Sequence, residues 1–498
     1  MTQTTFSATL SVTNPTTGES VGDVPLYNET TTREVFQRAR QAQKRWAQVP
    51  VNERKKIFLR YHNLVLERQD QLMDTIQEEN GKNRRSSFEE VLENAITARH
   101  YAYAAGRLLK TQRAKGALPI LTKTEVEHSP VGVVGIIAPW NYPLTLSMSD
   151  AIPAILAGNT VVLKPDSTTP MTALLGAELL REAGLPEDVL NVVPGPGSKV
   201  GQTIVAECDY LMFTGSTATG KTLAAQAGER LIGFSGELGG KNPLIVTADA
   251  NPKSIVRGVR DACFSNSGQL CISIERIYVH ENVASEFISE FSQAVNSMVI
   301  AADNSWDTDM GSLISSEHTD SVAEFVDDAV SKGATVLAGG KRLTDLGDAF
   351  YAPTVLGDVP ESARLFHEEV FGPVVRIEVI RSHEEAIEKA NDTGYGLNAS
   401  IFGPSKTARA IASQLEAGTV NINEGYAAGW ASLDAPMGGW KQSGVGRRHG
   451  DGGLLKFTEA RTIADQRLIT IAGPESMGSE KWNGLLTVAL KVARDYLR

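Results

Sequence analysis

The feature that most constrains the fold is an alternation of short apolar runs and helical segments that begins near residue 131. Four apolar runs follow one another: "VGVVGIIA", "NTVVLKP", "VLNVVPG" and "DYLMFTG". Each passes directly into a turn that contains glycine, proline or asparagine. Between the second and third lies "PMTALLGAELLREAG", where Pro170 suits a first helical turn and Gly184 suits a helix C-terminus. This alternation predicts β-α-β units on a parallel sheet with helices on both faces.

A second alternating block extends from about residue 242 to 440, and a largely helical segment, 33–110, precedes the first block. Strands are expected in the second block at "NPLIV", "RIYVH", "ATVLAGG", "PVVRIEVI" and "GTVNIN". A chain of 498 residues has room for about three domains or lobes of roughly 150 residues each. Ligands of open α/β sheets bind at the carboxyl ends of the strands, so we expect a site in a cleft between two α/β lobes.

The composition excludes several classes of partner. With 42% hydrophobic and 21% charged residues, the chain is typical of a globular protein, and its net charge of −11 argues against a nucleic-acid partner. Its three cysteines form no close pair, which predicts neither a disulfide framework nor a metal site and fits a reducing cytoplasm. The first residues lack the features of a signal peptide, and "VGVVGIIAPW" is about half as long as a membrane span. We therefore expect a cytoplasmic protein without membrane attachment.

The stretch "GSTATGKT", residues 215–222, matches the phosphate-binding loop of nucleotide triphosphatases. It follows an apolar run, as that pattern requires, and taken alone it indicates an ATPase. The pattern is short, however. Its glycines, Ser216 and a following helix N-terminus would suit any phosphate diester, including the pyrophosphate of a dinucleotide. The neighbouring motifs have to decide between the two.

Further motifs occur in a fixed order along the chain. They are "APWNYP", "KPDSTTP", "FTGSTATG", "ELGGKNP", "GQLC", "EEVFGPV" and "PMGGWKQSGVGRRHG". Together, over residues 10–465, they resemble the NAD(P)-dependent aldehyde dehydrogenase superfamily, and within it bacterial, in particular actinobacterial, succinate-semialdehyde dehydrogenases. The resemblance implies an α/β fold with a Rossmann-like cofactor lobe, an α/β catalytic lobe and a small β oligomerisation extension. It assigns 1–115 and 131–239 to the NAD(P)-binding domain and 240–440 to the catalytic domain.

The resemblance also gives roles to three residues. Oxidation of an aldehyde needs a nucleophile that adds reversibly to the carbonyl, and a thiolate of lowered pKa can serve near neutral pH. Cys271, in "SNSGQLCIS", matches that nucleophile, whereas Cys208 and Cys263 are expected to be buried core residues. The oxyanion needs preorganised donors, which the resemblance places at the Asn141 side chain and the backbone N–H of Cys271. Glu237 matches the general base that activates water to release the acid.

The expected cofactor is NADP or NAD, without a metal. Members that prefer NAD carry a glutamate three residues after the ribose-binding lysine, and that position is Ser167 here. Such a carboxylate would repel the 2′-phosphate of NADP by roughly 4 kcal/mol at about 4 Å and an effective dielectric of about 20. We therefore expect NADP to be preferred, unless Asp166 turns towards the ribose; equal use of both cofactors is the alternative. The cofactor positions implied by the resemblance are Pro139, Trp140, Lys164, Ser167, Gly215, Ser216, Glu369 and Phe371.

The substrate positions depart from the family pattern. Many succinate-semialdehyde dehydrogenases hold the distal carboxylate of the substrate with arginines, at positions occupied here by Ser149 and Ser265. A bidentate arginine is the natural ligand of a carboxylate. Two alternatives therefore stay open: succinate semialdehyde, which the resemblance favours, and a broader range of aliphatic or aromatic aldehydes. Tyr142 and Tyr426 are expected to line the tunnel in either case.

Two segments are expected to serve assembly. Residues 116–130 resemble the hairpin with which family members pair their subunits, and residues 455–475 are expected to return beside it. The resemblance therefore implies a homodimer or homotetramer. Residues 476–498 have the apolar spacing of an amphipathic helix. That helix is expected to dock on its own chain or on a sister subunit; attachment to a membrane surface is the weaker alternative, because one short helix binds weakly.

Overall fold

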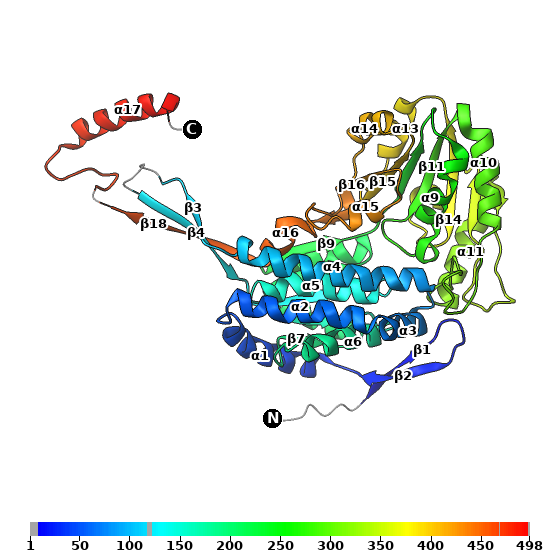
Figure 1. Cartoon of the computed structure of the whole chain (residues 1–498), viewed down its shortest axis with the longest axis horizontal. Helices are drawn as coiled ribbons and strands as arrows, with labels where there is room; N and C mark the ends of the chain where they lie inside the picture. Colours follow the sequence, from blue (N-terminus) through cyan, green and yellow to red (C-terminus); the bar gives the residue numbers. More distant parts are fainter. Residues whose placement is uncertain (1–7, 117–121, 468, 497–498) are drawn as a thin grey trace. The chain divides into compact units, whose positions relative to one another are not determined.

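The computed structural model describes residues 8–116, 122–467 and 469–496 (Figure 1). The chain divides into two compact units, which are residues 1–108 with 130–457 and residues 109–129 with 458–498. The first unit holds both α/β blocks of the sequence. The assignment of these blocks to cofactor binding and catalysis stays a prediction.

The N-terminal part of the first unit is helical, as the periodicity of residues 33–110 predicts. The first helix starts at a capping box, in which the Asn28 side chain accepts from the backbone N–H of Thr31. The third ends at Gly81, whose φ of +79° only glycine adopts easily. The elements of this part are β1 (Thr9–Thr13), β2 (Ser20–Pro25), α1 (Glu29–Trp46), α2 (Val51–Glu67), α3 (Gln69–Asn80) and α4 (Arg84–Leu108).

The first α/β block forms a six-stranded sheet in the order β17-β9-β8-β5-β6-β7, with β17 antiparallel to β9. The four predicted strands are present, and Pro170 and Gly184 bound the helix between the second and third, as expected. β9 was not predicted, because its sequence "GFSGE" contains two glycines. The elements are β5 (Val133–Ile137), α5 (Pro143–Leu156), β6 (Thr160–Lys164), α6 (Pro170–Glu182), β7 (Leu190–Val192), η1 (Gly197–Gly201), α7 (Gln202–Glu207), β8 (Tyr210–Thr214), α8 (Thr217–Glu229), β9 (Gly233–Glu237) and β17 (Gly444–Val445).

The second block forms a seven-stranded sheet in the order β12-β13-β14-β11-β10-β15-β16, in which β12 is antiparallel to β13. Strands β13 and β15 extend the predicted set. The elements are β10 (Asn242–Val246), α9 (Pro252–Phe264), η2 (Ser265–Gly268), β11 (Ile274–His280), α10 (Glu281–Asn296), α11 (Ser316–Ser331), β12 (Thr335–Ala338), β13 (Thr354–Gly357), α12 (Arg364–His367), β14 (Val374–Ile380), α13 (His383–Asn391), β15 (Asn398–Phe402), α14 (Ser405–Ala412), β16 (Thr419–Ile422), α15 (Ala427–Trp430), η3 (Lys441–Ser443) and α16 (Gly450–Leu455).

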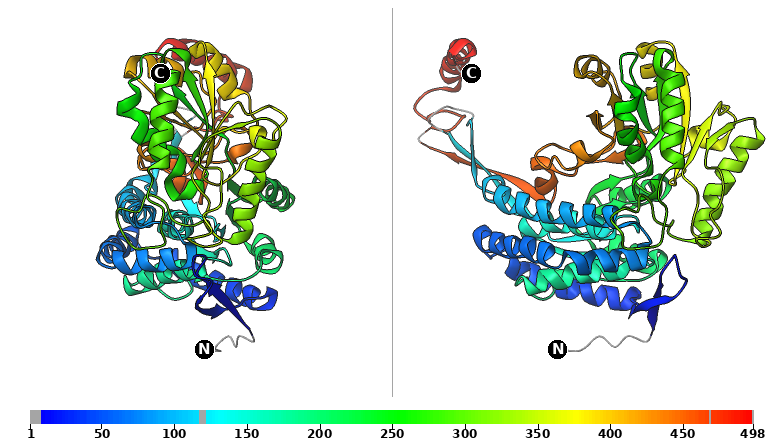
Figure 2. Two further views of the ribbon diagram at one scale, coloured as in Figure 1. Left: turned by 90° about the vertical axis from the view of Figure 1, so that its right-hand side faces the viewer. Right: turned by 45° about the vertical axis from the view of Figure 1, so that its right-hand side comes forward.

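Both faces of the second sheet are covered by helices (Figure 2). Leu244 and Val246 of β10 pack in one hydrophobic cluster with Phe287 of α10. Ile245 faces the other way and packs with Ile411 of α14. Because alternate residues of one strand enter different cores, the strand has to be apolar throughout. This explains the continuous apolar runs from which the parallel sheets were predicted.

The second unit is a small three-stranded sheet followed by a helix. Its elements are β3 (Gln112–Ala114), β4 (Thr122–Pro130), β18 (Thr458–Gln466) and α17 (Ser479–Tyr496), and the strand order is β18-β4-β3. The tip of the predicted hairpin, 117–121, and residues 497–498 of the predicted helix lie outside the described residues. On α17, Trp482 is buried, whereas Leu485, Val488, Leu490 and Val492 are 56–68% exposed. Docking of this apolar face on a sister subunit stays a prediction.

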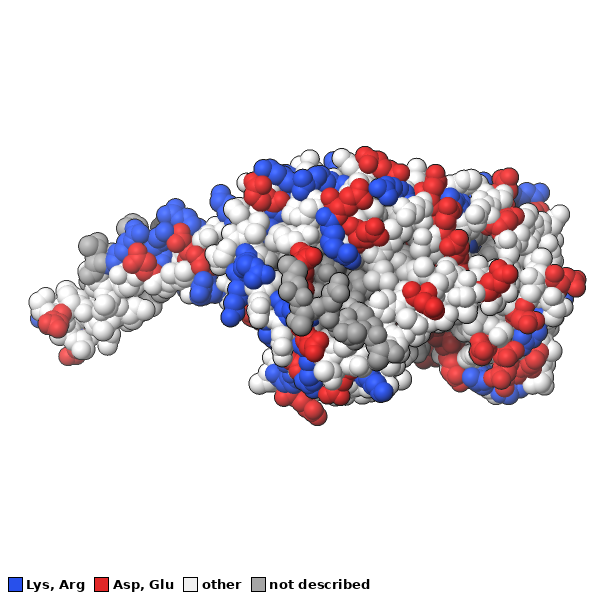
Figure 3. Space-filling model, turned by 90° about the horizontal axis from the view of Figure 1, so that it is seen from below, with Lys and Arg blue, Asp and Glu red and all other residues white. Residues whose placement is uncertain are grey.

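Surface charge and helix composition bear on the expected partners. On the face seen in Figure 3, basic side chains intermingle with acidic ones. None of the described helices is long and apolar enough to cross a bilayer. Within the described ranges, no group of three or more His, Cys, Asp or Glu side chains is arranged to hold a metal ion.

Candidate active site

Cys271 lies in the turn between η2 and β11. The residue is partly exposed, whereas Cys208 and Cys263 are buried as expected. The turn is held from the sheet, because the Cys271 carbonyl oxygen accepts a hydrogen bond of 2.8 Å from Nδ2 of Asn242 in β10. A cysteine that keeps partial exposure on a turn held in this way is suited to nucleophilic attack.

The surroundings of the thiol disfavour its ionised form. Burial by the surrounding protein is the main cause, and the negative charges of Glu369 and Glu237 add to it, so that the pKa of Cys271 rises to about 12. These surroundings do not give the lowered pKa that we expect of the nucleophile from the sequence. A positive charge placed beside the thiol would lower its pKa.

Glu237 is the last residue of β9, and only 6% of its surface is exposed. Burial raises the pKa of its carboxyl to about 7, although the positive charges of Arg448 and Lys456 act in the opposite direction. A carboxyl with a pKa near neutrality is suited to accept a proton during turnover. Because its charge acts on Cys271, the two side chains belong to one site.

Asn141 connects the strand end of β5 to the loop that carries Cys271. Its Nδ2 donates to the carbonyl oxygen of Gln269 at 3.0 Å. Its backbone carbonyl oxygen accepts from Nζ of Lys82, between α3 and α4, at 2.6 Å and from Nδ2 of Asn266 at 3.1 Å. The Asn141 amide is thus held against the cysteine loop from two sides.

The cysteine loop has an unusual backbone. Asn266 and Ser267 have positive φ values of 51° and 56° although neither is glycine. The backbone N–H of Asn266 donates to Oγ of Ser86 in α4 at 3.1 Å. Oγ of Ser267 donates to the carbonyl oxygen of Gly311 at 3.1 Å. Most polar side chains of "SNSGQLC" are therefore buried and make hydrogen bonds inside the protein, so this segment is not a surface loop.

Glu369 and Phe371 lie on the loop between α12 and β14. One carboxylate oxygen of Glu369 accepts from the backbone N–H of Gly240 at 2.8 Å. Burial, followed by the charge of Glu275, raises the pKa of Glu369 to about 8. The Phe371 ring meets the Trp140 ring edge-on, with 5.6 Å between centroids. These side chains come close to the segment that contains the predicted oxyanion donor.

A buried ion pair holds that loop in place. Glu275 of β11 accepts from the backbone N–H groups of Val370 and Phe371, each at 3.0 Å. The same carboxylate pairs with Lys241, which follows the "ELGG" turn. The predicted cofactor residues Glu369 and Phe371 are therefore tied to β11, the strand that follows Cys271. Sequence patterns gave no sign of this pair.

The predicted adenosine-ribose site lies at the carboxyl end of β6. Lys164 is only 5% exposed, and its Nζ donates to the carbonyl oxygen of Pro165 at 2.9 Å. Oγ of Ser167 donates to the carbonyl oxygen of Gly195 at 3.3 Å. The Asp166 carboxylate accepts from the backbone N–H and the hydroxyl of Thr168 at 3.0 and 2.8 Å, so it is engaged in its own turn. Its charge still raises the pKa of Lys164, which burial lowers.

The loop that resembles a phosphate-binding loop leads from β8 into α8, as expected. Gly215 follows the strand, and Ser216 is the helix N-cap, with its Oγ accepting from the backbone N–H of Thr219 at 3.3 Å. Ser216 is exposed. Lys221, the lysine of that pattern, donates to the side-chain oxygen of Gln442 at 2.6 Å. The exposed helix N-terminus is suited to an anion without any role for this lysine.

Three of the four predicted substrate residues lie together, around a carboxyl that the sequence does not single out. The hydroxyls of Tyr142 and Tyr426 donate to the two carboxylate oxygens of Glu89, at 3.1 and 2.9 Å. The Ser265 side chain interacts with the Tyr426 hydroxyl. Ser149 is different: it is buried in α5, where its Oγ donates to Glu93 at 2.5 Å.

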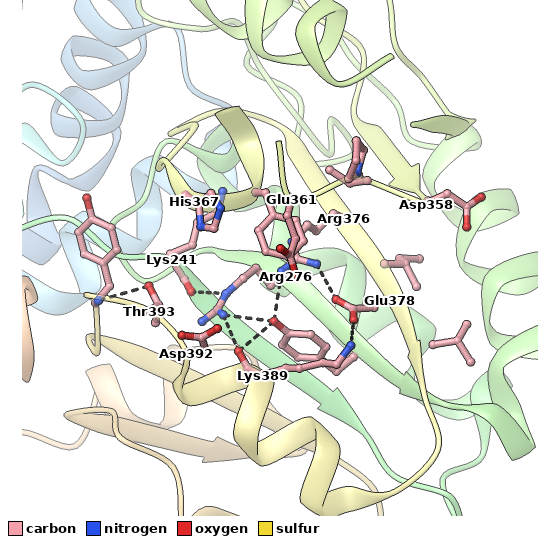
Figure 4. Close-up of a pocket in the computed structure, with 18 of the residues that line it drawn as sticks. Lys241, Arg276, Asp358, Glu361, His367, Arg376, Glu378, Lys389, Asp392 and Thr393 are labelled. Atoms are coloured by element: carbon pink, nitrogen blue, oxygen red, sulfur yellow. Dashed lines mark hydrogen bonds and ion pairs between the residues drawn. The ribbon is translucent and has the colours of Figure 1, made fainter. Parts of the chain in front are cut away.

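A separate cavity of about 850 Å³ opens beside β11 and β14 (Figure 4). Several of its charged side chains are engaged with one another and with the backbone. The Arg376 guanidinium donates to Glu378 at 2.8 Å and to the Tyr278 hydroxyl at 3.2 Å. Arg276 donates to the carbonyl oxygen of Lys241 at 2.7 Å. We assign no chemistry to this cavity, which is lined by these residues rather than by Cys271.

Comparison with known proteins agrees with the geometry. Residues 2–463 match the model of the aldehyde dehydrogenase family. A Mycolicibacterium smegmatis protein, provisionally named succinate-semialdehyde dehydrogenase (NADP⁺), is 53% identical over 479 residues, which are 96% of this chain and 93% of that protein. A Mycobacterium ulcerans protein, provisionally named succinate-semialdehyde dehydrogenase (NADP⁺) 2, is 51% identical over 467 residues, 94% of this chain and 90% of that protein. The NAD⁺ complex of a Bacillus cereus aldehyde dehydrogenase has a TM-score of 0.88 at 33% identity, covering 92% of this chain and 93% of that one.

The chain therefore belongs to the aldehyde dehydrogenase family. It is an enzyme that oxidises an aldehyde to its carboxylic acid with a nicotinamide dinucleotide. The expected α/β fold of that family is confirmed. This membership sets aside the ATPase that residues 215–222 indicate when taken alone.

Proposed function

We propose that the protein oxidises succinate semialdehyde to succinate with NADP⁺ in the cytoplasm. The observation that carries the reaction is the placement of Cys271 on a partly exposed turn, with the Glu237 carboxyl and the Asn141 amide beside that turn. The names of relatives at 53% and 51% identity support this substrate and cofactor. A broader range of aliphatic or aromatic aldehydes is the second candidate, because serines stand where many relatives of this kind carry arginines.

In the proposed mechanism, the Cys271 thiol loses its proton to solvent, and its Sγ bonds to the carbonyl carbon of the aldehyde while the π electron pair moves to the carbonyl oxygen, which becomes an oxyanion. The Asn141 side chain and the backbone N–H of Cys271 donate to that oxygen. When bound, the oxidised dinucleotide would supply a positive charge beside the thiol and a hydride acceptor. Collapse of the oxyanion re-forms the C=O bond, the carbonyl carbon gives up its hydride, and a thioester on Cys271 remains. Glu237 then takes a proton from water as the water attacks the thioester, which releases the carboxylic acid and restores the thiol.

The residues present fit a dinucleotide. The exposed N-terminus of α8 follows β8 directly and suits a pyrophosphate. A Cβ at Gly215 would lie 2.7 Å from the Phe213 ring, which is too close, so any other residue would displace this ring or the turn. Lys164, at the end of β6, which is separated from β8 by β5, would hold the adenosine ribose, and Glu369 the nicotinamide ribose. Pro139, Trp140 and Phe371 would border the nicotinamide ring.

Ser167→Glu is expected to reverse the cofactor preference. The new carboxylate would stand near the 2′-phosphate of NADP, and repulsion of up to about 4 kcal/mol corresponds to a loss of roughly 100- to 1000-fold in kcat/KM for NADP⁺. Values for NAD⁺ should change by less than about tenfold. The measurement is kcat/KM for both cofactors in wild type and variant. Ser405→Glu, an exposed serine on α14, adds the same charge elsewhere and should keep the wild-type ratio. A wild type that prefers NAD⁺, with the same ratio in Ser167→Glu, would contradict the assignment.

The proposed substrate is tested with three aldehydes: succinate semialdehyde, a neutral aldehyde of equal length and benzaldehyde. We expect the highest kcat/KM for succinate semialdehyde at pH 6–7. Equal or better turnover of the neutral analogue at every pH would show that the distal carboxylate is not recognised, and the broader specificity would then replace the proposal.

The proposed assembly is a homodimer or homotetramer. Its support is the small sheet of β3, β4 and β18, which forms a unit apart from the catalytic residues, and the exposed apolar side chains of α17. An exposed apolar face of this kind is commonly covered by a partner. Sedimentation velocity at micromolar concentration should report a multiple of the 53.6 kDa chain.

A further inference from the structure

Glu89 of α4 is a partly exposed residue whose carboxyl is held by two buried tyrosines. Tyr142 and Tyr426, which bind it, are only 4% and 5% exposed. The two phenols come from different segments: Tyr142 precedes α5, and Tyr426 is the N-cap of α15. Ser265, at the start of η2, adjoins Tyr426. The carboxyl is therefore held by two donors from distant parts of the chain, on a residue that keeps partial exposure.

This carboxyl lies along the segments that form the catalytic site. Tyr142 directly follows Asn141, the predicted oxyanion donor. On the other side, one amide group links the two loops: Nδ2 of Asn398 donates to the carbonyl oxygen of Ile272 at 2.9 Å and to that of Gly425 at 3.0 Å. Ile272 follows Cys271, and Gly425 precedes Tyr426. The Glu89 cluster is thus joined, along the chain and through Asn398, to the residues next to Asn141 and Cys271.

The surroundings of Glu89 bring the pKa of its carboxyl close to neutral pH, so that both the acid and the carboxylate are populated there. Burial raises the pKa of its carboxyl to about 7, while the hydrogen bonds from Tyr426 and Tyr142 and the charge of Lys82 lower it. Lys82 does not neutralise Glu89, because its Nζ pairs with Glu90 at 2.8 Å. Glu90 on the same helix raises the pKa of Glu89, and Glu424 acts on Tyr426.

We propose that Glu89 is the specificity residue of the substrate pocket: as a neutral acid it donates a hydrogen bond to the distal carboxylate of the aldehyde, and as a carboxylate it excludes that substrate. This inference rests on the proposed function. It explains how a pocket without arginine at positions 149 and 265 receives an anion. The chemical class it selects is an aldehyde with a terminal acid.

The proton balance of binding follows from the hydrogen-bond donors. When Glu89 is ionised, both phenols direct their protons to it, and a second carboxylate would meet only lone pairs and a like charge. When Glu89 is protonated, its own O–H becomes a donor, and one phenol is released to donate to the substrate. Above the pKa of Glu89, binding of the anionic aldehyde therefore takes up one proton. No covalent bond changes in this step.

The test compares succinate semialdehyde with a neutral aldehyde of equal length between pH 6 and 9. The ratio of their kcat/KM values cancels the titration of Cys271 and Glu237, because both substrates need those groups. In wild type the ratio should fall by about tenfold per pH unit above pH 7, because one proton is bound with the anion. In Glu89→Gln, whose amide imitates the neutral acid, the ratio should be independent of pH and exceed the wild-type ratio at pH 9 by about 100-fold.

Two further variants separate this role from a structural one. Glu67→Gln, at an exposed position at the end of α2, should keep the wild-type pH profile. Tyr426→Phe removes a hydrogen bond that stabilises the carboxylate, so the pKa of Glu89 should rise and the fall of the ratio should begin at higher pH. A purely structural Glu89 would not move this midpoint. Turnover of the neutral aldehyde reports whether each variant is folded.

A ratio that does not change with pH in wild type, or that falls equally in Glu89→Gln, would overturn the role of Glu89 while leaving succinate semialdehyde as the substrate. If neither protein oxidises succinate semialdehyde at pH 6 although both oxidise the neutral aldehyde, the proposed substrate is wrong, and the role of Glu89 falls with it.

Discussion

Cys271→Ala is expected to abolish aldehyde oxidation, with a loss of roughly 10⁴-fold or more in kcat. The physical reason is that no other described cysteine can replace it: Cys208 and Cys263 are buried, whereas Cys271 is partly exposed. Binding of NADP⁺ should be retained, because the predicted cofactor residues lie on other segments. The measurements are reduced-cofactor absorbance during turnover and a titration of cofactor binding.

The matched control is Cys208→Ala, which removes a thiol from the core of the first sheet. This variant should lose some stability to unfolding, because a buried side chain becomes smaller, but keep its kcat within about threefold. Substantial oxidation by Cys271→Ala would contradict the assignment of Cys271 as the nucleophile. Loss of cofactor binding in this variant would contradict a role of Cys271 that is limited to the substrate.

Glu237→Gln is expected to separate the two halves of the reaction. The first turnover should still release one equivalent of reduced cofactor, since thioester formation does not need this carboxylate. Steady-state turnover should fall by about 10²- to 10⁴-fold, because no base remains to activate water. In wild type, kcat should decline as pH falls below about 7, where Glu237 becomes protonated and can no longer accept a proton. The variant should lose this dependence.

Stopped-flow measurement of the burst, with the steady state that follows, provides the test. Glu229→Gln, an exposed glutamate at the end of α8, makes the same chemical change away from the site and should behave as wild type. An equal loss of burst and steady state in Glu237→Gln at neutral pH would mean that this carboxyl also acts before the thioester forms.

The sequence predicts most of what depends on local patterns. Apolar runs of β5, β6, β7 and β8 are recognisable because both faces of the sheet are buried. The turn after β8 is recognisable because glycine and serine satisfy a tight strand-to-helix connection. β9, which carries Glu237, escapes prediction because its glycines lower strand propensity, and pairing with β8 supplies what the local sequence lacks.

What depends on long-range contacts could not be predicted. Glu89 and Glu90 are neighbours in a helical segment. Their periodicity does not indicate that two tyrosine hydroxyls bind Glu89 or that Lys82 pairs with Glu90. Ser149 and Ser265 were paired by resemblance alone. In the structure the Ser149 side chain of α5 donates to Glu93 of α4, and every residue of α5 is buried. Ser265 instead lies beside Tyr426, at the start of η2.

The left-handed backbone of Asn266 and Ser267 has an energetic consequence for the nucleophile. Each non-glycine residue held in such a conformation costs of order 1–3 kcal/mol, and the loop by itself would relax. The hydrogen bonds that oppose this relaxation come from elsewhere: Ser86 in α4, Asn141 after β5 and Gly311 before α11. The strained conformation of the loop is therefore stabilised by three distant segments of the first unit. The position of the thiol depends on these tertiary contacts rather than on the nine residues around it alone.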